Sequence, residues 1–126
     1  MAAMGQVDHA MPSEGAEAAF KSVTDSTLAA LKAANLDDVL ETHFGAMPAA
    51  EFIMIPITDM IIHKWDLAKA TGQEAAIDNA LAEIGLATLT PGISRGREGG
   101  FFGPEMAVAA GASAQDLLLG LSGRTP

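Results

Sequence analysis

The chain has 126 residues, of which 49% are hydrophobic, and its formal net charge is −9. It has seven Lys and Arg residues and 16 Asp and Glu residues. This balance excludes the basic surface that binds nucleic acids and anionic membranes, so neither is expected as a partner. The absence of cysteine excludes disulfides, thiolate metal ligands and a cysteine nucleophile, and is compatible with a cytoplasmic protein. The length and the alanine-rich composition predict a single helical domain over residues 1–126.

The first third of the chain predicts a lead-in, a helix and a short extended segment. Residues 1–12 form an irregular lead-in without the pattern of a signal peptide. Apolar and small residues then recur at helical spacing, which predicts a helix over residues 14–34, with Ser13 as its N-cap and Asn35 closing it. Residues 35–47 carry no helical stripe, and "VLETHF" is predicted to be extended.

A second helix is predicted over residues 48–71. Pro48 suits its first turn and Gly72 suits the position just after its end. Pro56 lies inside it, which predicts a kink because proline removes one hydrogen bond of the helix. The first half of this helix is apolar nearly all round, as in the central helix of a bundle. Its apolar run is about half the length that a membrane span needs.

The last part of the chain predicts two further helices separated by a loop. Ile77, Leu81 and Ile84 share one stripe of a helix over residues 75–89. The following segment, "GISRGREGGFFGPEM", is predicted to be a glycine-rich loop. Ser113 is the expected N-cap of a short helix over residues 114–122.

Three residues of the second helix are candidates for chemistry. Asp59 and His63 are four residues apart and share one face of the helix, and Asp66 lies near the same face. Carboxylate and imidazole groups suit zinc, iron, nickel or manganese. The same residues can also form a hydrogen-bonded pair, or Asp66 can hold the His63 ring, without any metal. One helix cannot fill a four-coordinate site, so further ligands would have to come from elsewhere.

The remaining candidates are isolated. Arg95 and Arg97 can bind an anionic substrate group or the carboxylate of a thiol cofactor, or can belong to a solvated loop. His43 precedes the second helix and can fold back over His63. The only tryptophan, Trp65, lies on a different face from His63 and is interpreted as a packing residue. No serine has the Gly-x-Ser-x-Gly context of a hydrolase.

Three stretches carry a resemblance to a known family. The stretch "ITDMIIHKWDLAKATGQ" resembles the second metal-binding helix of actinobacterial proteins in the DinB/YfiT-like superfamily, which includes the mycothiol-dependent maleylpyruvate isomerases. The closing "GFFGPEMAVAAGASAQDLLLGLSGRTP" is similar to the end of a metal-binding branch of that superfamily, and "THFGAMPAAEF" fits the segment before the metal helix. The resemblance covers residues 14–126.

The resemblance implies an all-α, DinB/YfiT-like helical bundle with a divalent metal, zinc or nickel first, in its core. The family's ligands are a histidine on an early helix, then a carboxylate or histidine, and a histidine four residues later. The last two correspond to Asp59 and His63, with Asp66 orienting the ring and His43 as a possible third ligand. The family's first two helices have no counterpart, so we expect a truncation, a homodimer that completes the bundle, or a metal site shared by two chains.

Two functions follow as expectations. The first is a metal-dependent isomerase or transferase that uses a low-molecular-weight thiol such as mycothiol, in which Arg95 or Arg97 binds a carboxylate of a small-molecule substrate. The second is a non-catalytic helical module that works through association and retains a degenerate metal site.

Overall fold

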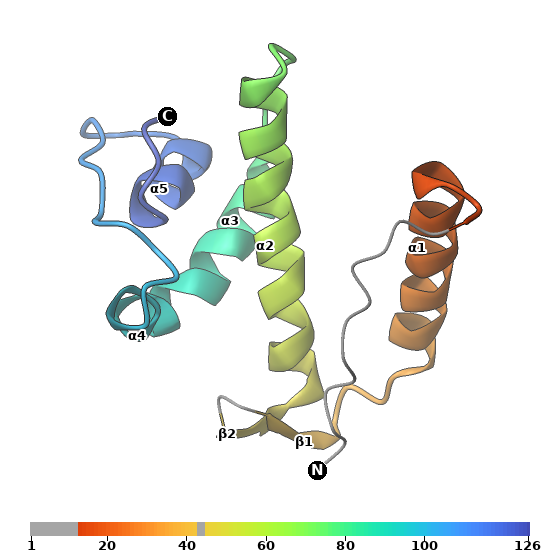
Figure 1. Ribbon diagram of the computed structural model, residues 1–126. Coiled ribbons are helices and arrows are strands. Elements are labelled where there is room, and N and C mark those ends of the chain that lie inside the picture. The colour runs from red at the N-terminus through yellow and green to blue at the C-terminus, as the bar shows by residue number, and fades with distance from the viewer. Residues whose placement is uncertain (1–12, 43–44) are drawn as a thin grey trace. The chain divides into compact units, whose positions relative to one another are not determined.

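A computed structural model describes residues 13–42 and 45–126, and it is mostly helical (Figure 1). The chain divides into two compact units, Met1–Asn35 and Leu36–Pro126. The predicted helical class is therefore confirmed, while the likeness to a particular bundle stays a prediction. No helix within the described ranges has the length and apolarity that a membrane span requires.

The described part of the first unit is built on helix α1, Ala16–Ala33. Its length agrees with the predicted helix, but its N-cap is Gly15, with φ 87°, and no side chain caps it. The predicted capping role of Ser13 is therefore wrong. No residue of α1 is buried, although its sequence alternates apolar and polar faces at helical spacing.

The second unit begins with a small antiparallel hairpin of strands β1, Val39–Thr42, and β2, Gly45–Pro48. The first strand was predicted as an extended segment, whereas the second was not predicted. Leu40 pairs with Met47 in the register of the hairpin. The amide of Ala49 donates to the Asp38 carbonyl at 2.8 Å, so the hairpin is hydrogen-bonded to the start of the next helix.

Helix α2, Ala49–Ala70, is the longest element and agrees with the predicted helix. Pro48 is its N-cap rather than part of its first turn, and Gly72 follows its end with φ 69°, a conformation that glycine adopts without strain. The helix is not buried on all sides, as its apolar first half predicted for the central helix of a bundle. Met60 and Leu67 are 69% and 63% exposed. Ala49 is buried at the first position of the helix, and the other buried residues share one face: Thr58, Ile61, Ile62 and Trp65.

Helix α3, Asn79–Leu89, starts four residues later than predicted because Asp78 caps it, accepting hydrogen bonds from the amides of Ala80 and Leu81. A 3-10 turn, Thr90–Gly92, and helix α4, Ile93–Glu98, follow. The predicted glycine-rich loop is therefore wrong over its first part. Ile93 is buried at the start of α4, and this burial explains why a glycine-containing segment is helical here.

The core of the second unit is formed by α2, α3 and α5, Ala114–Leu121. Ser113 caps α5 as predicted, accepting a hydrogen bond from the Asp116 amide. Leu118 of α5 is fully buried and packs with Ile61 and Ile62 of α2. Gly85 lets α3 approach α5 closely, because a Cβ there would lie 2.8 Å from a methyl group of Leu118. This packing brings the end of α5 beside the polar face of α2.

Candidate functional site

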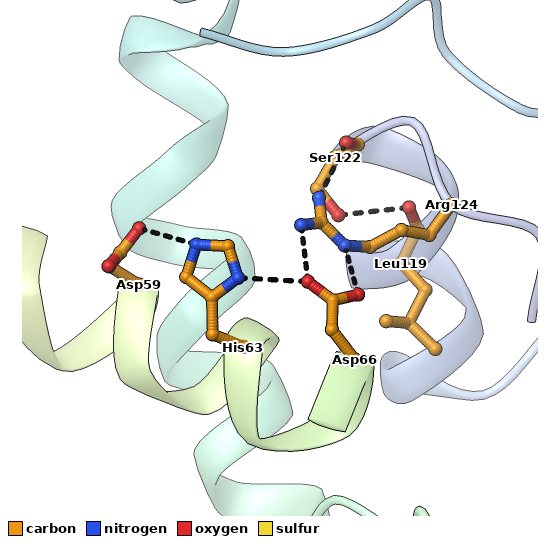
Figure 2. A network of polar contacts seen from close by, with 6 residues as sticks. All are labelled: Asp59, His63, Asp66, Leu119, Ser122 and Arg124. Atoms are coloured by element: carbon orange, nitrogen blue, oxygen red, sulfur yellow. Dashed lines mark hydrogen bonds and ion pairs between the residues drawn. The ribbon is translucent and has the colours of Figure 1, made fainter. Parts of the chain in front are cut away.

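A network of polar side chains joins α2 to the segment after α5 (Figure 2). Asp59, His63 and Asp66 come from α2, and Arg124 comes from the residues that follow α5. The spacing of four and then three residues places the α2 members on successive turns of one helix face, as predicted. The contact with Arg124 was not predicted.

His63 stands between two carboxylates. Its Nδ1 lies 2.9 Å from Asp66 Oδ2, within hydrogen-bonding distance, and its Nε2 lies 3.3 Å from Asp59 Oδ1. A neutral imidazole has one N–H donor and one nitrogen lone pair, whereas an imidazolium has two donors. The arrangement therefore fits either a charged ring that faces both carboxylates or a neutral ring whose Nδ1–H is held by Asp66 and whose Nε2 is free to bind a cation.

Asp66 is anchored from its other side by Arg124. The guanidinium donates from Nε to Oδ1 at 2.8 Å and from Nη2 to Oδ2 at 2.7 Å. This two-point geometry fixes the plane of the carboxylate. The hydrogen bond from Arg124 is the main reason that the pKa of Asp66 lies below its ordinary value, and the contact with His63 acts in the same direction against the partial burial of the group.

Arg124 is itself held by the end of α5. Its Nη1 donates to the Ser122 carbonyl at 3.0 Å, and its backbone amide donates to the Leu119 carbonyl at 2.8 Å. The Ser122 hydroxyl, which is buried, donates to the same Leu119 carbonyl at 3.0 Å. Figure 2 shows the contacts of the Arg124 side chain with Ser122 and of Ser122 with Leu119. The ring of His63 is thus connected to α5 by a continuous series of polar contacts.

The surroundings of the site differ from the buried setting that its apolar sequence context suggested. The side chains of His63 and Asp59 are 60% and 67% exposed. Trp65, by contrast, is only 8% exposed, and the Lys69 ammonium lies 5.1 Å from its ring centre. Its predicted role in packing is confirmed. The polar face of α2 is therefore open to solvent, and a small molecule or ion can reach it.

The other predicted residues lie away from this network. Arg97 donates to the carbonyls of Leu121 at 2.6 Å and Gly103 at 3.2 Å, so its guanidinium joins α4 to the end of α5. Arg95 is exposed on α4. Anion binding by the two arginines stays a prediction, and Arg97 would have to exchange these contacts to take part. His43 lies outside the described residues.

The donor set can be compared with the requirements of a divalent metal. Over residues 13–42 and 45–126 there is no group of three or more His, Cys, Asp or Glu side chains that could hold a metal ion. Two ligands of a tetrahedral zinc ion, at bond lengths of about 2.0–2.2 Å, lie about 3.3–3.5 Å apart. The 3.3 Å between Asp59 Oδ1 and His63 Nε2 fits that separation. A metal ion at this position would have two ligands from the pair, and water or a bound molecule would have to fill its other coordination positions.

Comparison with known proteins gives no further guide, because no family model, no curated protein and no solved structure matches this chain. The resemblance of the three stretches to the DinB/YfiT-like superfamily stays an expectation. The candidate site consequently depends on its own geometry.

Proposed function

We propose that this chain binds a divalent metal ion, zinc or nickel, through Asp59 Oδ1 and His63 Nε2. The observation that supports the proposal is the arrangement around one imidazole ring. Nδ1 is within hydrogen-bonding distance of a carboxylate that is itself fixed by an arginine, while Nε2 faces a second carboxylate oxygen at 3.3 Å. Metal-binding histidines commonly donate their other ring N–H to a carboxylate, which sets the tautomer and aligns the ring.

Each residue would have a separate role in such a site. Asp66 accepts the Nδ1–H of His63 and leaves the lone pair of Nε2 free. Asp59 supplies a hard oxygen ligand and offsets one charge of the ion. A bound divalent metal supplies Lewis acidity for a carbonyl, a thiol or a water. The exposure of both ligand side chains leaves room for a small molecule to complete the coordination.

The resemblance extends this proposal to a reaction class. A DinB/YfiT-like metal protein of this kind would be a thiol-dependent isomerase or transferase, with mycothiol or a similar thiol as its cofactor. Arg95 is the better candidate for binding the substrate's carboxylate, since Arg97 already donates to two carbonyls. A second copy of the chain, in a homodimer, would complete the bundle and can supply the missing ligand.

An association module is the second candidate function, and the exposed apolar side chains favour it. Phe20 and Val23 of α1 are 75% and 65% exposed, and Met60 and Leu67 of α2 are exposed to a similar degree. Apolar surface left in water is unfavourable by about 25 cal/mol per Å², so a partner that covers it would gain stability. Light scattering tests this candidate, because a monomer at every concentration and with added zinc would exclude self-association.

The proposed metal site is tested by titrating zinc into protein stripped with a chelator, by calorimetry and by competition with a zinc indicator. We expect saturable binding of one zinc ion per chain, or of one per two chains if a homodimer shares the site. Removal of an outer hydrogen-bond partner of a metal ligand weakens metal binding by about 10- to 100-fold. His63→Ala and Asp59→Asn each remove a ligand itself, so each should weaken zinc binding by more than that.

Asp25→Asn is the matched control for this titration. Asp25 is also an exposed helical carboxylate that is paired with a cationic residue four positions away, Lys21, but it has no imidazole beside it. We expect the zinc affinity of this variant to equal that of the unmodified chain. Failure of the unmodified chain to bind zinc, or equal binding by His63→Ala, would contradict the proposed function.

A further inference from the structure

We propose that Arg124 is a positioning residue for His63, which acts through Asp66, and that the turn at Gly123 is the element that places it. The consequence for metal affinity rests on the proposed function, whereas the consequence for the His63 ring can be measured without any metal. Nothing in the sequence connects these residues, since 58 positions separate Arg124 from Asp66.

The contacts of Asp66 explain how an arginine can control an imidazole that it does not touch. Arg124 occupies both carboxylate oxygens, at 2.8 and 2.7 Å. Oδ2, which receives the Nη2 donor, is also the oxygen that lies 2.9 Å from His63 Nδ1. Rotation of the carboxylate would break two contacts with Arg124 at once. The guanidinium therefore holds Oδ2 in the position from which it can accept a hydrogen bond from Nδ1–H.

The two carboxylates beside His63 differ in how firmly they are held. Asp66 is 33% exposed and has the two-point contact with Arg124, whereas Asp59 is 67% exposed and lies at the longer distance of 3.3 Å. A neutral ring has one N–H group, which donates its hydrogen bond to the carboxylate that is better positioned. With Arg124 in place, that carboxylate is Asp66, so the lone pair is on Nε2, the atom that faces Asp59.

Charge works against this arrangement and makes the proposal testable. The positive guanidinium neutralises Asp66 and weakens its attraction for the ring proton, while its fixed geometry favours the same hydrogen bond. If geometry decides, a lysine at position 124 cannot replace arginine, because an ammonium lacks the planar fork that engages two oxygens. If charge decides, lysine and arginine will behave alike.

The backbone after α5 determines where Arg124 lies. The amide of Gly123 donates to the Gly120 carbonyl at 3.0 Å and that of Arg124 donates to the Leu119 carbonyl at 2.8 Å. This is the Schellman pattern, which requires a left-handed residue just after the helix. Gly123 has φ 85°, and a Cβ there would also lie 3.1 Å from Gly103 Cα. A residue with a side chain at this position is disfavoured for both reasons. Such a substitution would displace the turn, and Arg124 would be displaced with it.

The first test measures zinc affinity in Arg124→Gln and Arg124→Lys. We expect both to bind zinc about 10-fold more weakly, the lower end of the range for loss of a hydrogen-bond partner of a metal-binding histidine, because Arg124 acts through that partner. Lys32→Gln, which removes one exposed positive charge from α1, is the matched control and should bind normally. Normal affinity in Arg124→Lys or in Arg124→Gln would overturn the positioning role.

The second test changes the turn without changing Arg124. Gly123→Ala should weaken zinc binding as Arg124→Gln does. Gly111→Ala is its matched control, because Gly111 also has a left-handed backbone, with φ 77°, but has open space around it. Circular dichroism checks that both variants are folded. Equal zinc affinity in the two folded glycine variants would overturn the role of the turn, and if Gly123→Ala does not fold, the Arg124 variants decide the proposal.

The third test separates this inference from the proposed function. In metal-free protein at a pH where imidazoles are neutral, nitrogen NMR of the His63 ring reports which nitrogen is protonated. We expect the Nδ1–H form in the unmodified chain and a loss of that form in Arg124→Gln. That result supports the positioning role even if the chain binds no zinc. An unchanged tautomer in Arg124→Gln overturns it even if zinc binding depends on Asp59 and His63.

Discussion

The two faces of α2 differ in what holds them in place. On the buried face, Ile61 and Ile62 pack against Leu118, a contact without directional requirements. On the polar face, His63 is adjacent in sequence to Ile62 but is exposed, and it is oriented by Asp66 and Arg124. One helix thus combines a face that packs in the core with a polar face that contacts Arg124, 58 positions after Asp66.

Among the variants that compare the two faces of α2, Ile62→Ala is expected to change the free energy of unfolding most. Ile62 is 3% exposed in the small core, and removing a buried isoleucine side chain lowers the free energy of unfolding by about 2–5 kcal/mol. Urea unfolding followed by the fluorescence of Trp65, the only tryptophan, measures this loss. Leu67→Ala, on the exposed side, is the control and should change the free energy by less than about 0.5 kcal/mol. A similar loss in both variants would contradict the distinction.

Thr58→Val tests the one polar side chain on the buried face. Thr58 is 3% exposed, and its hydroxyl oxygen has no hydrogen-bond partner among the described residues. A buried hydroxyl without a partner is unfavourable, so replacement by a methyl group of similar shape should raise the free energy of unfolding by about 1 kcal/mol. Thermal unfolding would show this as a higher midpoint. Destabilisation would mean that the hydroxyl makes a contact in solution.

Acid pH should weaken the contact between Asp66 and Arg124 on the polar face of α2. Since the pKa of Asp66 is lower in the folded chain than its ordinary value, ionised Asp66 stabilises the fold above that ordinary value. This contribution disappears as the pH falls through the ordinary value and then through the lowered one. Because the pair is partly exposed, the contribution should not exceed about 1 kcal/mol.

Unfolding free energies of the unmodified chain and of Asp66→Asn, measured from pH 7 downward, test this expectation. The difference between them should shrink in acid. In an Arg124→Gln background the same difference should be smaller near pH 7, because the hydrogen bond that contributes most to the lowered pKa of Asp66 is gone. A difference that stays constant from pH 7 to acid would rule out the ion pair between Asp66 and Arg124 in solution.

Met60→Lys should have the smallest effect on stability. Met60 is 69% exposed, and exposed positions usually tolerate substitution within about 0.5 kcal/mol. Measured at high and low protein concentration, the variant also reports on self-association. If a second copy covers this side of α2, the lysine will lower the mass observed by light scattering at high concentration.

Local signals in the sequence predicted most of the helices. Ser113 caps α5, and Pro48 and Gly72 gave the ends of α2 to within about one residue. The second strand of the hairpin was missed because "GAMP" is too short to show alternation. Helix α4 was missed because its glycine and arginine residues are typical of loops, and the burial of Ile93 is not apparent from the sequence.

The sequence predicted only part of the polar network around His63. The spacing of Asp59, His63 and Asp66 predicted a shared helix face, because those contacts depend only on helix geometry. Arg124 was not predicted, since its partner is fixed by how α5 packs on α2 and α3. A glycine followed by arginine after an apolar helix does signal a left-handed turn, but it does not say which residue the arginine will meet.

The exposure of Asp59 and His63 has a consequence for the rate at which an ion would be exchanged. A metal enclosed in a core leaves only when the protein opens, whereas one held at an open helix face can be approached by an incoming ligand while its protein ligands are still attached. Replacement of one ligand at a time then provides a path for transfer to another molecule. A site built in this way on α2 would release its ion by substitution rather than by unfolding.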